Sequence, residues 1–87
     1  MSAVIAYTDG GARGNPGPAA AGAIIVTDGK VTHRFKKFLG HQTNNWAEYE
    51  AVILVLGKAA ELGIVPHEIR LDSMLVAQQL SGNWKIK

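Results

Sequence analysis

Apolar residues follow two kinds of spacing along this chain, which together predict four strands and two helices. Short apolar runs bounded by glycine, proline or aspartate are typical of strands. Longer stretches rich in Ala, Leu, Glu and Lys favour helices. The predicted strands cover residues 3–8, 20–27, 30–39 and 68–72, and the predicted helices cover residues 45–62 and 74–81.

Turn residues predict how these elements are connected. Asp28-Gly29 is a residue pair that closes two-residue hairpins. Glycine and proline are so frequent in residues 10–18 that we expect an irregular loop there. In the third strand, apolar residues such as Val31 and Phe35 share one parity, which predicts one apolar face and one solvated face.

Capping residues indicate where the helices begin and end. Asn45 is the expected N-cap of the longer helix and Gly63 its C-terminal stop, while Ser73 and Gly82 are expected to bound the shorter one. Gly57 lies inside the longer helix, where glycine costs about 1 kcal/mol relative to alanine. A close backbone contact at Gly57 would explain its presence.

The element order β-β-β-α-β-α predicts an α/β fold with a mixed sheet. A right-handed crossover through the longer helix makes the fourth strand parallel to the first. The spatial strand order is then 3-2-1-4, if consecutive strands pair. The first and fourth strands end side by side, and these ends carry Asp9 and Asp72. Ligands of open α/β sheets bind at such carboxyl ends.

Composition narrows the class of protein. The 87 residues suffice for one small domain, which we expect to span residues 1–87. Apolar residues make up 47% of the chain, which indicates an unusually complete core or apolar surface that awaits a partner. The absence of cysteine excludes disulfides and thiolate metal sites. No apolar run approaches the ~20 residues of a membrane span, so we expect a soluble cytoplasmic protein.

Three carboxylates stand where an acid is costly unless it is paired or bound to a cation. Asp9 and Asp72 each follow an apolar run, and Glu48 falls on the predicted apolar stripe of the longer helix with Val52 and Val55. Carboxylates that converge at one end of a sheet form a hard-oxygen site for Mg²⁺ or Mn²⁺. We therefore predict a metal site made by Asp9, Glu48 and Asp72.

Each of these acids also has an ordinary structural explanation. Asp9 could form a simple turn with Gly10. Glu48 could complete a capping box with Asn45, and Asp72 could cap the shorter helix. Each explanation is reasonable alone, but the position of all three acids at the same end of one sheet favours the metal site.

These residues together resemble ribonuclease HI, the type 1 RNase H family. Tyr7–Pro18 is similar to the family's first-strand signature, and Thr43–Tyr49 to the start of its central helix. Leu71–Val76 is similar to its fourth strand and the following helix, and residues 82–87 resemble the next segment in members without a basic handle. The resemblance implies an RNase H fold and cleavage of the RNA strand of RNA–DNA hybrids with two divalent metal ions.

The resemblance also implies roles for individual residues. Asp9 would bridge the two ions, while Glu48 and Asp72 would hold the ion on the leaving-group side. Substrate-binding residues would contact sugars, phosphates and minor-groove edges of the hybrid. Carried over from the family, these residues are Gly10, Gly11, Asn15, Thr43, Asn44 and Asn45.

The chain departs from the family pattern in ways that affect the expected activity. The family's fourth carboxylate, fifth strand and last helix have no counterpart here, so we expect a shortened form in which one ion is incompletely liganded. Met74 stands where the family usually has a glutamine that contacts a base. We therefore expect weak cleavage, or a site that a second chain completes.

Three alternatives stay open at this stage. The chain could be such an enzyme, a module that binds hybrids or duplex RNA without efficient cleavage, or an incomplete gene product. The open edge of the fourth strand and an uncovered apolar sheet face predict a homodimer formed through that edge.

Overall fold

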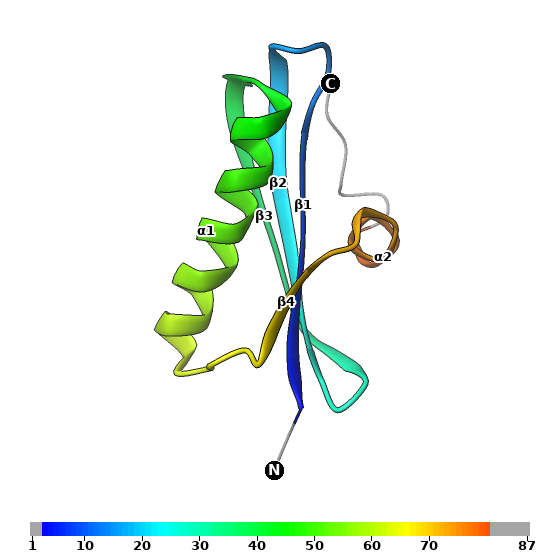
Figure 1. Ribbon diagram of the computed structural model, residues 1–87, viewed down its shortest axis with the longest axis vertical. Coiled ribbons are helices and arrows are strands. Elements are labelled where there is room, and N and C mark those ends of the chain that lie inside the picture. Colours follow the sequence, from blue (N-terminus) through cyan, green and yellow to red (C-terminus); the bar gives the residue numbers. More distant parts are fainter. Residues whose placement is uncertain (1–2, 81–87) are drawn as a thin grey trace.

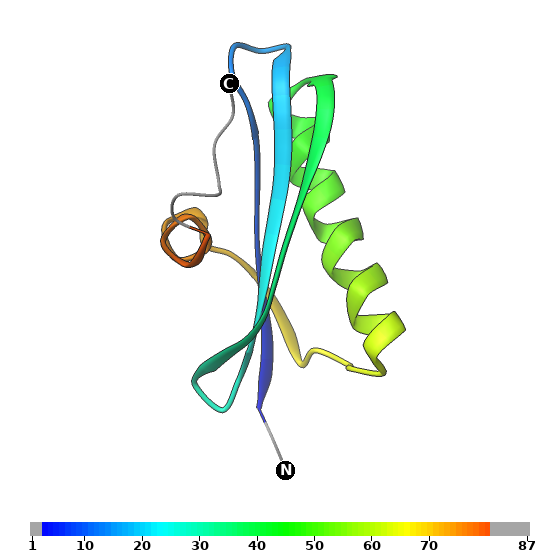
Figure 2. The same cartoon turned by 180° about the vertical axis from the view of Figure 1, so that it is seen from behind.

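The three N-terminal apolar runs form an antiparallel meander, and the fourth strand joins the sheet after a helix. The computed structural model describes residues 3–80. Its strands are β1 (Val4–Ala12), β2 (Gly17–Thr27), β3 (Lys30–Gln42) and β4 (Glu68–Leu71), and its helices are α1 (Asn44–Leu62) and α2 (Ser73–Gln79). Figure 1 shows α1 along one face of the sheet and α2 against the other, and the rear view in Figure 2 shows the same arrangement. Neither of these two described helices is long and apolar enough to cross a bilayer.

The strand order confirms the predicted topology. The strands are arranged β3-β2-β1-β4, and β4 is parallel to β1. The parallel register pairs Thr8 with Leu71, the last residue of β4. Asp9 and Asp72 each follow one member of this pair, so the crossover brings both residues to the same level of the sheet.

Two apolar clusters attach the helices, one on each face of the sheet. The buried residues between α1 and the sheet are Ala6, Ala23, Ile25, Val55 and Ala59. The buried residues between α2 and the sheet are Ile24, Val76 and Leu80. Because alanine supplies three of the five residues in the first cluster, the backbone of α1 packs close to the strands.

Strand β1 extends further than predicted. The expectation of an irregular loop over residues 10–18 is wrong for much of that range, because Gly10–Ala12 continue β1 and pair with Ala19–Ala21 of β2. The small side chains of both segments allow the antiparallel ladder to continue. Asp9 therefore lies inside a strand, which excludes the explanation of this acid as a simple turn residue.

The expectation that β3 has one apolar and one solvated face is also wrong. Val31 packs with the α2 cluster, whereas Phe35 packs with the α1 cluster, although both have the same parity. A register shift after Ile25 places an extra residue in β3. Such a bulge moves the following side chains to the opposite face. Arg34 accordingly lies on the α2 side and donates a hydrogen bond to Gln79 at 3.0 Å.

The predicted turn residues adopt the expected conformations. Asp28 and Gly29 close the β2–β3 hairpin with φ angles of 51° and 81°. Gly63 ends α1 in the left-handed conformation, whereas the proposed stop at Gly82 lies outside the described residues. The expectation of a close contact at Gly57 is wrong, because a Cβ placed there would meet nothing within 4 Å.

Both predicted N-caps are replaced by an earlier residue. Thr43 caps α1 in place of Asn45, and Asp72 caps α2 in place of Ser73. In each case a side-chain oxygen accepts a hydrogen bond from the backbone N–H three residues later, which is the geometry of an N-cap. Thr, Asn, Asp and Ser are all favourable N-cap residues, so residue type alone does not determine which one caps the helix. The backbone conformation at the start of each helix determines it.

Candidate functional site

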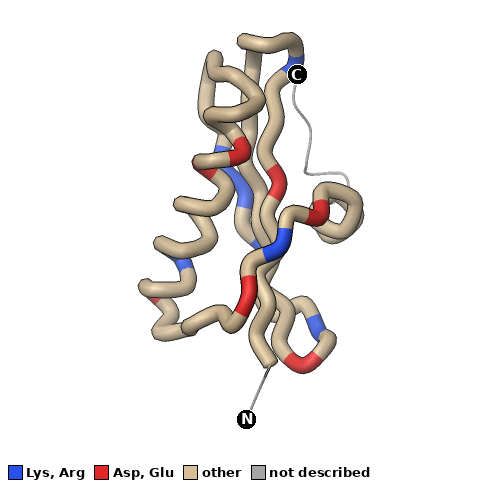
Figure 3. The backbone as a smooth tube through the Cα atoms, viewed as in Figure 1, with Lys and Arg blue, Asp and Glu red and all other residues tan. Residues whose placement is uncertain are grey.

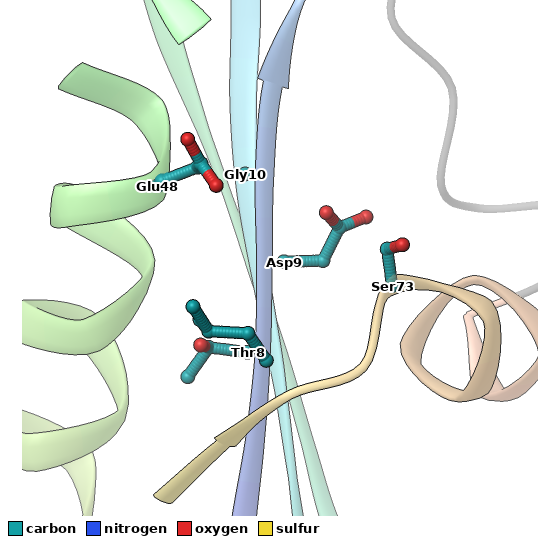
Figure 4. A pocket seen from close by; sticks show the side chains of 6 residues that line it. Thr8, Asp9, Gly10, Glu48 and Ser73 are labelled. Atoms are coloured by element: carbon teal, nitrogen blue, oxygen red, sulfur yellow. The ribbon is translucent and has the colours of Figure 1, made fainter. Parts of the chain in front are cut away.

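A pocket of about 220 Å³ lies beside Asp9, where β4 ends and α2 begins. Its lining comes from β1, α1, β4 and α2, and consists of Thr8, Asp9, Gly10, Glu48, Leu71 and Ser73. In Figure 4 the carboxylate of Asp9 points toward Ser73, and Glu48 approaches from α1 on the other side of β1. The pocket therefore brings together two of the three predicted acids.

Glu48 lies beside the buried stripe of α1 and not within it. The stripe consists of Ala47, Ala51, Val55 and Ala59. The predicted alignment of Glu48 with Val52 on the buried face is therefore wrong, and Glu48 is exposed. Because Thr43 is the N-cap, Glu48 comes too late in the helix to be the third residue of a capping box. The capping-box explanation for this acid is thereby excluded.

Asp9 is an acid whose surroundings disfavour its charged form. Partial burial raises the pKa of its carboxyl group above the ordinary value, and the negative charge of Glu48 raises it further. A hydrogen bond from the backbone of Gly10 acts in the opposite direction, because it stabilises the carboxylate. The net direction of the pKa shift is upward, because burial is the largest of these effects.

Asp72 does not join this pair. Its Oδ1 accepts a hydrogen bond from the backbone N–H of Leu75 at 3.0 Å, and Asp72 does not line the pocket. Figure 3 shows acidic positions on β1, early in α1 and just before α2 around the same part of the sheet. Within residues 3–80, however, no three acidic, histidine or cysteine side chains form a group that could hold a metal ion. The structure thus supports the capping role predicted as the alternative for Asp72.

Three pocket residues were not singled out by the sequence: Thr8, Leu71 and Ser73. The parallel pairing of Thr8 with Leu71 places these two residues side by side. A prediction of the register between the first and fourth strands would therefore have identified them. Thr8 is 1% exposed, and its hydroxyl has no hydrogen-bond partner among the described residues. A buried polar atom without a partner at a pocket wall indicates a place for a polar ligand or its water.

The predicted substrate-binding asparagines have structural hydrogen bonds of their own. Asn44 Oδ1 accepts a hydrogen bond from Ala12 N at 2.7 Å, and Asn44 N donates to Asn15 Oδ1 at 3.0 Å. These bonds connect the end of β1, the loop after it and the first turn of α1. Asn45 is exposed, and Gly11 pairs with Ala20 within the sheet.

The pocket has the donor chemistry of a divalent-cation site. Asp9 and Glu48 supply hard carboxylate oxygens, which suit Mg²⁺ and Mn²⁺. The ion pairs Lys58–Glu61 and Arg70–Glu68 include neither Asp9 nor Glu48. The two carboxylates and the unpartnered Thr8 hydroxyl therefore fit a hydrated cation, to which the structure contributes two acids.

Comparison with known proteins identifies similar chains. The RNase H family model matches residues 1–87. Ribonuclease HI of Halobacterium salinarum is 49% identical over 82 residues, which cover 93% of this chain and 41% of that protein. This chain therefore spans less than half the length of that relative.

Solved structures agree with this result. The crystal structure of RNase H1 from Halobacterium salinarum has a TM-score of 0.75 and 47% identity, with 97% of this chain and 64% of that chain covered. LC11-RNase H1, crystallised in complex with an RNA/DNA hybrid, has a TM-score of 0.73 and 42% identity, with the same two coverages of 97% and 64%.

The charge of Asp9 is expected to lower the stability of the metal-free protein. Because the folded-state pKa of Asp9 is raised above its ordinary value of 3.8, the folded protein binds this proton more tightly than the unfolded chain. Stability therefore falls as pH rises from about 3.8 through the folded-state pKa. Asp9→Asn should melt at a higher temperature than the parent at neutral pH in chelator, and the difference should shrink below pH 4.

Thermal melts between pH 3 and pH 8 test this expectation. Glu61→Gln is the matched control, since Glu61 is an exposed acid of α1 outside the pocket and should show no such pH-dependent gain. A lower melting temperature for Asp9→Asn than for the parent at neutral pH would contradict the assignment of Asp9 as an electrostatically costly residue.

Proposed function

The chain belongs to the ribonuclease H family, and from this premise we propose that its 87 residues form a single RNase H-like domain that hydrolyses the RNA strand of RNA–DNA hybrids with divalent metal ions. The observation that carries the proposal is the pocket that Asp9 of β1 and Glu48 of α1 both line. Two acids with neighbouring charges are costly in a structural role and useful in a cation site.

The residues have distinct tasks in this proposal. Asp9 and Glu48 bind the cation, and Asp72 contributes the carboxylate oxygen that does not cap α2. A divalent ion bound there supplies Lewis-acid activation for phosphodiester hydrolysis. Thr8 lines the pocket, and its buried hydroxyl, unpartnered among the described residues, would donate a hydrogen bond to a water molecule there.

The hybrid is proposed to contact the polar groups beside the pocket. The side-chain oxygens of Asn15 and Asn44 already accept backbone hydrogen bonds. Those bonds do not use their amide NH₂ groups, which we propose as donors to phosphate oxygens or 2′-hydroxyls, together with Thr43 and Asn45 at the start of α1. Such contacts suit the wide, shallow minor groove of A-like duplexes.

The position of Asp72 supports a second candidate function. Within the described part of the chain no third acid joins Asp9 and Glu48. A site with two carboxylates holds its ions weakly, so the domain could bind hybrids without cleaving them efficiently. Cleavage and binding measured on the same hybrid distinguish the two candidates.

We predict that Mn²⁺ stabilises the folded protein through these acids. Ligand binding to the folded state alone adds about 2.7 kcal/mol at one hundred times Kd, which raises the melting temperature of a domain of this size by about 11–22 °C. Asp9→Asn should show no such rise. Asp72→Asn separates two roles, because asparagine caps a helix as well as aspartate does.

The expected result for Asp72→Asn is a metal-free melting temperature near that of the parent and a reduced response to Mn²⁺. Asp72→Ala should lose about 1 kcal/mol of stability in addition, because it removes the cap. A full response of Asp72→Asn to Mn²⁺ would show that Asp72 is a helix cap and not a metal ligand.

Cleavage of a labelled RNA–DNA hybrid tests the function directly. We expect slow cleavage of the RNA strand that is faster with Mn²⁺ than with Mg²⁺, because Mg²⁺ demands a nearly complete octahedral shell. Asp9→Asn should be inactive, and Glu61→Gln should match the parent. Hybrid binding without cleavage at millimolar Mn²⁺ would favour the binding module, and fast turnover with Mg²⁺ would contradict the proposed weakness.

A homodimer formed through β4 is part of the same proposal. All four residues of β4 are exposed, and this strand forms one edge of the sheet. Two copies related by a two-fold axis could pair β4 with β4 and continue the sheet. Light scattering at micromolar concentration should give about twice the mass of one chain, and Ile69→Lys should lower it. A monomer at these concentrations would contradict the dimer.

A further inference from the structure

The backbones of β1 and α1 touch at Gly10. A Cβ atom built on Gly10 would lie 2.1 Å from the carbonyl oxygen of Ala47, 2.2 Å from its carbonyl carbon and 2.6 Å from the nitrogen of Glu48. Real Cβ atoms do not approach other heavy atoms within 3.0 Å. All three neighbours are backbone atoms, so no rotation of a side chain could make room.

This contact joins the two elements that carry the pocket acids, strand β1 and helix α1. Gly10 follows Asp9 directly, and the atoms it touches belong to Glu48 and to the residue before it. The first turn of α1 is held to the same part of β1 by the hydrogen bond from Ala12 N to Asn44 Oδ1. One contact and one hydrogen bond thus determine how far the helix stands from the strand at the level of the acids.

We infer that Gly10 is a positioning residue that sets the spacing between the Asp9 and Glu48 carboxylates, and through it the affinity of the site for a divalent cation. This inference rests on the proposed function and identifies the backbone contact on which the spacing of the two metal ligands depends. Any side chain at position 10 must move the start of α1 away from β1 by roughly 1 Å, the difference between 2.1 Å and the 3.0 Å limit. A displacement of this size is enough to disable a site whose two ligands come from different elements.

Gly57 provides a control glycine in α1, the helix that Gly10 contacts. A Cβ there would meet no atom within 4 Å, so Gly57→Ala adds helix propensity without a clash. We expect Gly57→Ala to raise the melting temperature by about 4–8 °C and to leave the response to Mn²⁺ unchanged. The same substitution can offset the stability that Gly10→Ala loses.

The experiment compares Gly10→Ala in the Gly57→Ala background with Gly57→Ala alone. We expect apparent Mn²⁺ affinity to fall about 10- to 100-fold, the range seen when groups that orient metal ligands are removed. Glu48→Gln should lower Mn²⁺ affinity strongly in the Gly57→Ala protein and only slightly when Gly10→Ala is also present. Such non-additivity is expected if Gly10 acts through Glu48.

A metal-free measurement separates this inference from the proposed function. In the parent, nuclear Overhauser effects should connect the Hα protons of Gly10 with the amide proton of Glu48, and they should weaken in the Gly10→Ala protein. If the parent shows this contact but no response to Mn²⁺, the proposed function fails while the spacing remains established. Absence of the contact in the parent overturns the inference.

Two other outcomes also overturn it. The first is a folded Gly10→Ala/Gly57→Ala protein that binds Mn²⁺ as tightly as Gly57→Ala. The second is a double variant that does not fold, because the contact would then serve global packing and not local placement of Glu48.

Discussion

The close packing of α1 against the sheet is the constraint on which the rest of this structure depends. The interface is rich in small residues, with Ala6 and Ala23 of the strands and Ala59 of the helix in one buried cluster. At Gly10 even a methyl group would not fit. Because helix and strand lie so close, a glutamate on α1 reaches the same pocket as an aspartate on β1. Larger residues in this interface would separate the two acids before they changed the topology.

The pocket combines groups that are unfavourable for stability when nothing is bound. Burial and the neighbouring Glu48 both raise the pKa of Asp9, and the hydroxyl of Thr8 is buried without a partner in the described residues. Groups of this kind persist where a ligand satisfies them. Asp72 differs, because its carboxylate already stabilises the start of α2. One side chain therefore connects the stability of a helix with the proposed cation site, and the substitution by asparagine separates the two roles.

Local signals in the sequence predicted most elements, and they failed where a distant segment decided the outcome. The Asp28-Gly29 hairpin and the stop at Gly63 were predicted correctly, because each depends on residues that tolerate positive φ. The continuation of β1 beyond Asp9 was not predicted, because glycines in a sequence indicate a loop. Gly10 and Gly11 are in a strand because they pair with small residues of β2. Val31 and Phe35 likewise face opposite sides only because a bulge in the pairing with β2 shifts the alternation.

The sequence by itself determined the element order, the parallel pairing of β1 with β4 and the identity of Asp9 and Glu48 as candidate site residues. The first two follow from periodicity and the handedness of crossovers, and Asp9 follows from the cost of an acid next to apolar residues, whereas Glu48 was selected by an alignment with the buried stripe that the structure does not show. Only the tertiary structure decided that Thr43 and Asp72 cap the helices, that Glu48 lies beside the buried stripe, and that Gly10 touches the backbone of α1. Such features depend on how segments far apart in the sequence are placed, to within about an ångström at Gly10, and no local pattern encodes that placement.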